Sequence, residues 1–198
     1  LGVFSQVYSI YILLSQISAL GVQLSVLKHI PQFSGDRVEC NHIINGAMLS
    51  AGVTAAAVTV LTYFIKDFFG YVLASPGVAE GFVFAIPALF FFALNKVLLA
   101  FLNGFRWMKA YAVFQAMRYI LLLASAVFLI KFSFDGNRIA LIFTLSEFFL
   151  FVPLALYSLR FSRIDISGAS LKWGVNHTRF GLKAAGGNML INTRIDII

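Results

Sequence analysis

A bundle of membrane-spanning helices is the fold class that this sequence predicts. Three observations support it: 60% of the residues are hydrophobic, only 12% are charged, and the apolar residues gather in long runs. A soluble domain usually has about 45–50% apolar and about 25% charged residues, whereas a helix needs about 20 apolar residues to cross a bilayer. We therefore expect an all-α polytopic membrane protein.

Five runs are long enough to cross the bilayer, at residues 3–27, 43–65, 82–104, 110–130 and 139–159. A sixth begins near residue 179 and stops at the last residue while its helical pattern continues. The first run opens without a starting Met, so we expect an internal piece of a longer protein. Small residues recur in the second run at spacings of three and four, which lets helices approach closely in lipid: Gly46, Ala47, Ser50, Ala51, Thr54 and Ala55.

The charges of the connecting loops predict the orientation of the protein. Loops 28–42, 104–109 and 160–179 carry eight basic residues, whereas the loops on the other side carry only Lys66, Lys131 and Arg138. Because Lys and Arg accumulate in cytoplasmic loops, the side with eight basic residues is expected to be cytoplasmic.

The longest cytoplasmic loop, residues 161–178, marks a candidate boundary between two parts of the protein. It is basic and contains Gly and Ser, as linkers often do. We expect residues 1–160 to form a first lobe of five helices and residues 179–198 to begin a second lobe.

Several function classes are disfavoured by composition and motifs. The net charge of +7 comes mainly from basic residues that flank apolar runs, so nucleic acid is not an expected partner. Cys40 is the single cysteine, and the three histidines are expected in surface loops, so neither a metal site nor a cofactor is predicted. Soluble-enzyme motifs such as a P-loop, GxSxG or HExxH do not occur, and we do not expect an enzyme.

Two basic residues lie inside predicted spans and are the main candidates for function. Lys96 is eight residues before the end of the third span, and Arg118 is eight residues after the start of the fourth. At 1.5 Å per residue both lie roughly 12 Å inside the cytoplasmic surface. Spans joined by a short turn are normally neighbours, so the two cations are expected at one shared site. An anionic ligand such as a phosphate would suit them, although both side chains could instead reach the interface along their stems.

Other polar residues fall on the same helix faces. Gln115 shares a face with Arg118, and Asn103 shares one with Lys96. The first span adds Gln16 and Gln23, which are seven residues apart and lie on one side; these amides either line a wet cavity or bond between helices. Glu147, near mid-membrane, either pairs with a cation such as Arg118 or serves with Asp196 as an ion-coupling site.

Four stretches of the chain resemble the polysaccharide flippases (Wzx-type, O-antigen and related transporters) of the multidrug/oligosaccharidyl-lipid/polysaccharide exporter superfamily. The stretch "LGVFSQVYSIYILLSQISALGVQLSVLKHIPQF" resembles their second helix, and "LLAFLNGFRWMKAYAVFQAMRYILL" resembles the turn between helices four and five. The break before residue 179 resembles the inter-lobe loop. "RFGLKAAGGNMLINTRIDII" resembles the start of helix seven, with Lys183, Arg194 and Asp196.

The resemblance implies a fragment, helices two to six plus most of helix seven, of a two-lobe bundle of about 12–14 helices. It implies alternating access that moves an undecaprenyl-diphosphate-linked oligosaccharide from the inner to the outer leaflet of a bacterial or archaeal cytoplasmic membrane. Arg118, Lys183 and Arg194 would contact the diphosphate, whereas the role of Lys96 rests on its depth. Membrane lipids and the polysaccharide polymerase machinery are the other partners implied.

Two alternatives stay open. A drug or organic-cation antiporter of the same superfamily should have a cavity that favours acids, whereas the predicted spans hold four bases and two acids. A membrane scaffold without transport should have all its buried charges paired internally.

Overall fold

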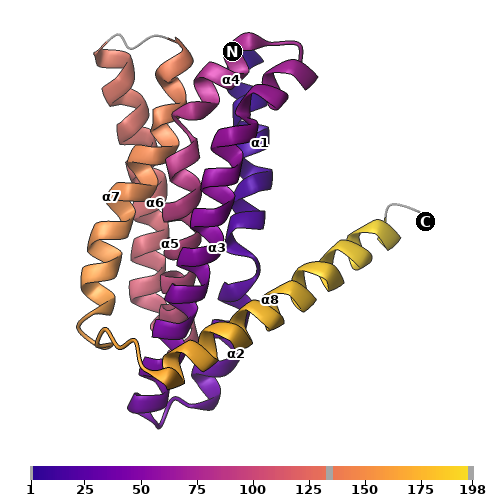
Figure 1. Cartoon of the computed structure of the whole chain (residues 1–198). Helices are drawn as coiled ribbons and strands as arrows, with labels where there is room; N and C mark the ends of the chain where they lie inside the picture. Colours follow the sequence, from indigo (N-terminus) through magenta and orange to yellow (C-terminus); the bar gives the residue numbers. More distant parts are fainter. Residues whose placement is uncertain (1, 133–135, 196–198) are drawn as a thin grey trace.

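The structure, a computed structural model, describes residues 2–132 and 136–195, apart from the side chains of residues 137 and 185–195. The described part of the chain is helical between short turns (Figure 1). Its elements in order are α1 (Gly2–Ala19), α2 (Val22–Gln32), α3 (Arg37–Val72), α4 (Pro76–Val83), α5 (Ile86–Gly104), α6 (Met108–Lys131), the 3-10 helix η1 (Gly136–Ala140), α7 (Leu141–Ser158) and α8 (Gly168–Ile195).

Four helical segments are long and apolar enough to cross a membrane: α3, α5, α6 and the η1–α7 segment. The pair α1 and α2, bent by 43°, gives a fifth when counted as one span. The described residues therefore form the all-helical bundle of a multi-pass membrane protein, as the sequence predicts. Over its described residues α8 is not among these candidate spans.

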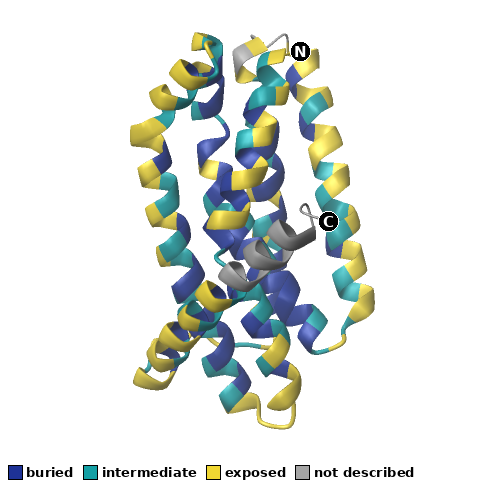
Figure 2. Ribbon diagram, turned by 90° about the vertical axis from the view of Figure 1, so that its right-hand side faces the viewer, coloured by how far each residue is buried: buried dark blue, intermediate teal, exposed yellow. Residues whose placement is uncertain are grey.

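Helix α5 is the centre of the bundle. It contacts α1, α2, α3, α6 and α7, and Figure 2 shows the buried residues gathered in the middle of the bundle. This central position decides which of its residues meet which neighbours.

Two of the expected spans are interrupted. The run 3–27 breaks where Leu20 and Gly21 adopt positive φ values of 44° and 69°. The run 82–104 breaks at residues 84–85, so that α4 precedes α5 and Pro87 occupies the first turn of α5. Apolar residues continue through both breaks, which is why the sequence reads as continuous spans.

The expected loop 161–178 is wrong in its second half, because α8 already begins at Gly168. The first half of α8 lies across α2 and α3, and the second half of α8 extends away from the bundle (Figure 1). Glycines set this crossing: a Cβ at Gly46 would lie 2.7 Å from the backbone N of Gly174. A Cβ at Gly181 would collide with the Leu20 carbonyl oxygen. The small-residue face of the second span is thus buried in helix contacts, as expected.

The three histidines are not surface loop residues, as the sequence analysis expected, because all three lie in helices. His177 of α8 is fully buried: its Nδ1 lies 2.8 Å from Ser25 Oγ on α2, and its Nε2 lies 3.0 Å from the Ile43 carbonyl oxygen on α3. Burial lowers the pKa of His177 to about 4. A neutral imidazole therefore joins α8 to both helices.

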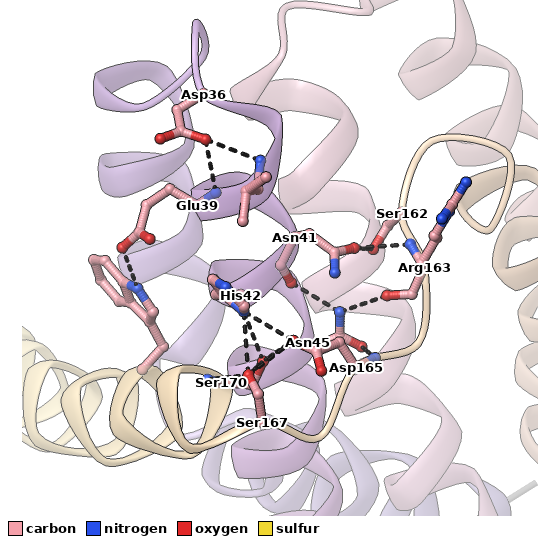
Figure 3. Close-up of polar contacts among 12 residues, drawn as sticks. Asp36, Glu39, Asn41, His42, Asn45, Ser162, Arg163, Asp165, Ser167 and Ser170 are labelled. Carbon is pink, nitrogen blue, oxygen red and sulfur yellow. Dashed lines mark hydrogen bonds and ion pairs between the residues drawn. The ribbon is translucent and has the colours of Figure 1, made fainter.

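A polar cluster holds the loop 159–167 on the first turns of α3 (Figure 3). Asn41 Oδ1 accepts hydrogen bonds from Ser162 Oγ and from the backbone N–H of Arg163, both at 2.7 Å. Asn45 Nδ2 donates to the Arg163 carbonyl oxygen at 2.8 Å. Hydrogen bonds from Ser167 and Ser170 lower the pKa of the Asp165 carboxyl.

Candidate functional site

The candidate site is built around the ring of Phe92 on α5. Lys96 Nζ lies 4.9 Å from the centre of this ring, and Arg118 Cζ lies 5.2 Å from it. Phe92 and Lys96 are one turn apart on α5, whereas Arg118 comes from α6. Tyr11 of α1 packs edge-on against Phe92 at 6.2 Å between ring centres, so α1, α5 and α6 meet at this ring.

Glu147 of α7 neutralises Arg118. Arg118 Nε lies 3.2 Å from Glu147 Oε1, and Arg118 Nη2 donates to Glu147 Oε2 at 3.3 Å. The two side chains are 15% and 5% exposed, respectively. Asn95 Nδ2 also donates to Glu147 Oε2 at 2.8 Å and to the Glu147 carbonyl oxygen at 2.9 Å. The carboxylate is thus held by α5 and α6 together.

Lys96 is the cation without a carboxylate. Its Nζ donates a 2.7 Å hydrogen bond to Gln16 Oε1 of α1, and within the described ranges it belongs to no ion pair. The side chain is half-buried. With Lys96 and Arg118 positive and Glu147 negative, the cluster has a net charge of +1. Such a site attracts an anionic group, because the ring and the amide leave the ammonium charge uncompensated.

Three expectations about these residues are confirmed. Equal depth on neighbouring helices brings Lys96 and Arg118 to one place. Glu147 pairs with Arg118, which is one of the two roles considered for it, and Gln16 bonds between helices. Whether Glu147 also couples transport to an ion stays a prediction.

The other candidates are not part of this cluster. Gln115 Nε2 donates to the Tyr111 hydroxyl at 3.0 Å, one turn of α6 closer to the predicted cytoplasmic side. Asn103 lies about 10 Å further along α5 from Lys96, at 1.5 Å per residue. Lys183 is exposed on α8. The side chain of Arg194 and all of Asp196 lie outside the described residues.

Sequence reasoning missed Phe92 and Asn95. Phe92 is one of 22 phenylalanines, and its ring carries no signal of its own. Asn95 is fully buried, and its Oδ1 has no hydrogen-bond partner among the described residues. An amide directly beside an intramembrane lysine was the available signal for Asn95, since buried polar groups in lipid need partners.

Comparison of the chain with protein-family models, with characterised proteins and with solved structures gives no match.

Proposed function

We propose that the protein is a flippase that moves a lipid-linked oligosaccharide diphosphate from the inner to the outer leaflet of a prokaryotic cytoplasmic membrane, for cell-surface polysaccharide synthesis. The observation that supports it is the uncompensated charge of Lys96, held on Phe92 beside the Arg118–Glu147 pair. A half-buried ammonium without a carboxylate partner is costly within a membrane span, and an anionic ligand would offset this cost. The four stretches that resemble polysaccharide flippases supply the class of anion.

In this proposal the diphosphate approaches from the cytoplasmic side and first meets Lys96, a point charge. Arg118 offers a planar fork that suits two phosphate oxygens. To use it, Arg118 exchanges Glu147 for the phosphate. Glu147 is then left with Asn95 alone, and uptake of a proton or a cation by this carboxylate would couple the ion to the cargo.

Two other functions make different demands on the same residues. An organic-cation antiporter needs a carboxylate that is free to meet a cation, whereas Glu147 is already held by Arg118 and Asn95. A scaffold without transport needs its buried charges paired, whereas Lys96 has only an amide and a ring. Both observations favour an anionic cargo.

Lys96→Gln in the full-length protein is the direct test. The variant keeps a polar side chain that can bond Gln16, and it leaves the Arg118–Glu147 pair intact. We expect it to weaken binding of a lipid-linked oligosaccharide diphosphate by about tenfold, corresponding to about 1.4 kcal/mol, and to reduce glycan export at matched expression. Binding is measured by titration of the reconstituted protein.

Lys131→Gln is the matched control, because Lys131 is exposed at the last residue of α6, at the end away from the predicted cytoplasmic side. It should leave the affinity unchanged. A lipophilic cation is titrated in parallel. If the cation binds and the diphosphate does not, the antiporter replaces the flippase; if neither binds, the scaffold does.

A further inference from the structure

A second feature of the bundle is an apolar pocket of about 440 Å³ between α3, α5, α7 and the loop 159–167. This volume lies in the range of about 300–1,000 Å³ typical of ligand sites. The pocket runs from the middle of α3 and α5 to the end where the basic loops lie. Its lining includes Met48, Gly52, Phe90, Leu94, Phe151 and Ile164.

The pocket and the ion cluster lie on opposite sides of α5. Phe90, Leu94 and Leu98 face the pocket, whereas Phe92 and Lys96 face the cations. An offset of two residues turns a helix by about 200°, so the two sets point in nearly opposite directions. The pocket is therefore a separate site, and its occupant does not contact Lys96 or Arg118.

The loop end of the pocket combines exposed apolar and basic side chains. Ile164 and Ile166 line the pocket and are 75% and 67% exposed. Arg160 and Arg163 are exposed on the same loop, and within the described residues neither guanidinium has an ion-pair or hydrogen-bond partner. Figure 3 shows the Arg163 guanidinium turned away from the polar cluster.

The loop that carries these residues is held in place before any ligand binds. Its backbone and Ser162 are bonded to Asn41 and Asn45 of α3 at 2.7–3.2 Å. These amides are occupied inside the protein, so a polar headgroup at the mouth of the pocket would meet the two arginines. Arginine recognises phosphate oxygens well.

We propose that the pocket binds one acyl chain of an anionic glycerophospholipid of the cytoplasmic leaflet, with its phosphate beside Arg163 and Arg160. An apolar groove ending in unpaired cations at a membrane surface complements such a lipid in both shape and charge. The much longer polyisoprenyl chain of a lipid-linked glycan would not fit in this volume. This proposal does not depend on the transported substrate, because the ion cluster lies on the other side of α5.

Gly52→Phe tests the acyl-chain site. A Cβ at Gly52 meets no atom within 4 Å, so a larger side chain can enter the pocket without displacing the backbone. The full-length protein is extracted from vesicles of equal parts phosphatidylglycerol and phosphatidylcholine, and retained lipids are measured by native mass spectrometry. We expect wild type to retain one phosphatidylglycerol and Gly52→Phe to lose it. Val53→Phe, at an exposed neighbouring position of α3, should retain it.

Arg163→Gln together with Arg160→Gln tests the headgroup. We expect the preference for phosphatidylglycerol over phosphatidylcholine to fall at least fivefold. The proposal is overturned if wild type retains no phospholipid, if Gly52→Phe retains as much as wild type, or if phosphatidylcholine is held equally well by wild type. Retention of an added lipid-linked glycan that Gly52→Phe abolishes would assign the pocket to the cargo instead. Cross-linking of a cysteine at residue 52 to another segment of the full-length chain would assign it to that segment.

Discussion

At Phe92, two cations lie against one aromatic ring, and within the described residues only Arg118 has a carboxylate partner. A charge near the centre of a membrane helix costs about 2.5–3.5 kcal/mol on insertion scales. For Arg118 this cost is offset by Glu147 and by the ring, since a desolvated cation–π contact contributes up to about 2 kcal/mol. For Lys96 the offset comes only from the ring and the Gln16 amide. Without a ligand the two residues therefore differ: Arg118 is paired with Glu147 and joins α6 to α7, whereas Lys96 has no carboxylate partner among the described residues.

The Arg118–Glu147 pair gives a prediction about stability. Glu147→Leu removes the carboxylate, so Arg118 loses its partner and Asn95 keeps only the backbone carbonyl of residue 147 as an acceptor. Breaking one side of a buried ion pair costs about 3–5 kcal/mol, whereas replacing both partners by apolar residues is often close to neutral. We expect Glu147→Leu to lower Tm strongly and Arg118→Leu/Glu147→Leu to recover most of the loss, measured by thermal unfolding in detergent.

The exposed pair Lys66–Asp67, with 3.0 Å between Nζ and Oδ1, is the control. Asp67→Ala should change the free energy of unfolding by less than about 1 kcal/mol, because surface ion pairs contribute little. If the double variant is as unstable as Glu147→Leu alone, then the loss of stability does not come from an unpaired Arg118, and the ion-pair explanation is wrong.

Depth along a helix was the part of the site that the sequence could predict. Counting residues from the span ends places Lys96 and Arg118 together, and the structure confirms it. The role of Asn95 depends on rotation about the helix axis, because Asn95 and Lys96 are neighbours in sequence but point about 100° apart. His177 was mistaken for a loop residue because α8 begins among polar residues, and its burial depends on contacts with distant α2 and α3.

At the level of helices, glycine decides how closely α8 approaches the bundle. Gly46 of α3 meets Gly174 of α8, and Gly21 at the α1–α2 break meets Gly181. Gly174 and Gly181 are seven residues apart and so share one face of α8. His177 lies on the same face between them. These two glycine contacts and the buried imidazole lie along one face of α8, and hydrogen bonds from Trp173 to Glu39 and between Thr178 and Ser50 also join α8 to α3.

Gly46→Ala should loosen this crossing. The new Cβ would lie 2.5 Å from the Ser170 carbonyl oxygen and 2.7 Å from the Gly174 backbone N, so α8 must move away. We expect amide hydrogen exchange in residues 168–183 to become at least tenfold faster, measured by mass spectrometry on the full-length protein. Gly52→Ala is the control on the same helix: its Cβ meets nothing within 4 Å, and exchange should stay as in wild type.

The breaks within two expected spans could not be predicted from hydrophobicity. Hydrophobicity continues through residues 20–21 and 84–85, so a count of apolar residues reads each run as one span. Gly21 and Pro87 were the local signals, but both residue types are tolerated inside membrane helices. The early start of α8 was hidden for the opposite reason: its first residues are polar, and contacts with α2 and α3 stabilise them as a helix.

For the whole molecule, the basic loops define one end of the bundle. Figure 1 places α2 and the start of α8 at this end and α4 at the other. Trp107 contacts Phe161 at 4.3 Å between ring centres, and Phe33 contacts Trp173 at 5.9 Å. Aromatic residues of this kind are common at membrane–water interfaces. They join the turns that the loop charges assign to the cytoplasmic side.

This orientation is tested with single cysteines in the full-length protein carrying Cys40→Ser. A membrane-impermeant maleimide added to intact cells should label Ser75→Cys, between α3 and α4. Ser34→Cys, between α2 and α3, should be labelled only after the membrane is permeabilised, because its loop is expected on the cytoplasmic side. The reverse pattern would invert the assignment of every loop and place Lys96 in the outer half of the bilayer.

The glycine crossing also has a mechanical consequence. At the Gly46–Gly174 contact backbone meets backbone, so the resistance to a rotation of α8 comes from two neighbouring side chains: His177, which is bonded to Ser25 and to the Ile43 carbonyl oxygen, and Trp173, which donates to Glu39. The end of α8 lies 21 residues beyond Gly174, or about 31 Å at 1.5 Å per residue. By that geometry a rotation of about 10° at the crossing displaces the end of the helix by about 5 Å. A small change of angle at this contact thereby becomes a large displacement of the end of α8.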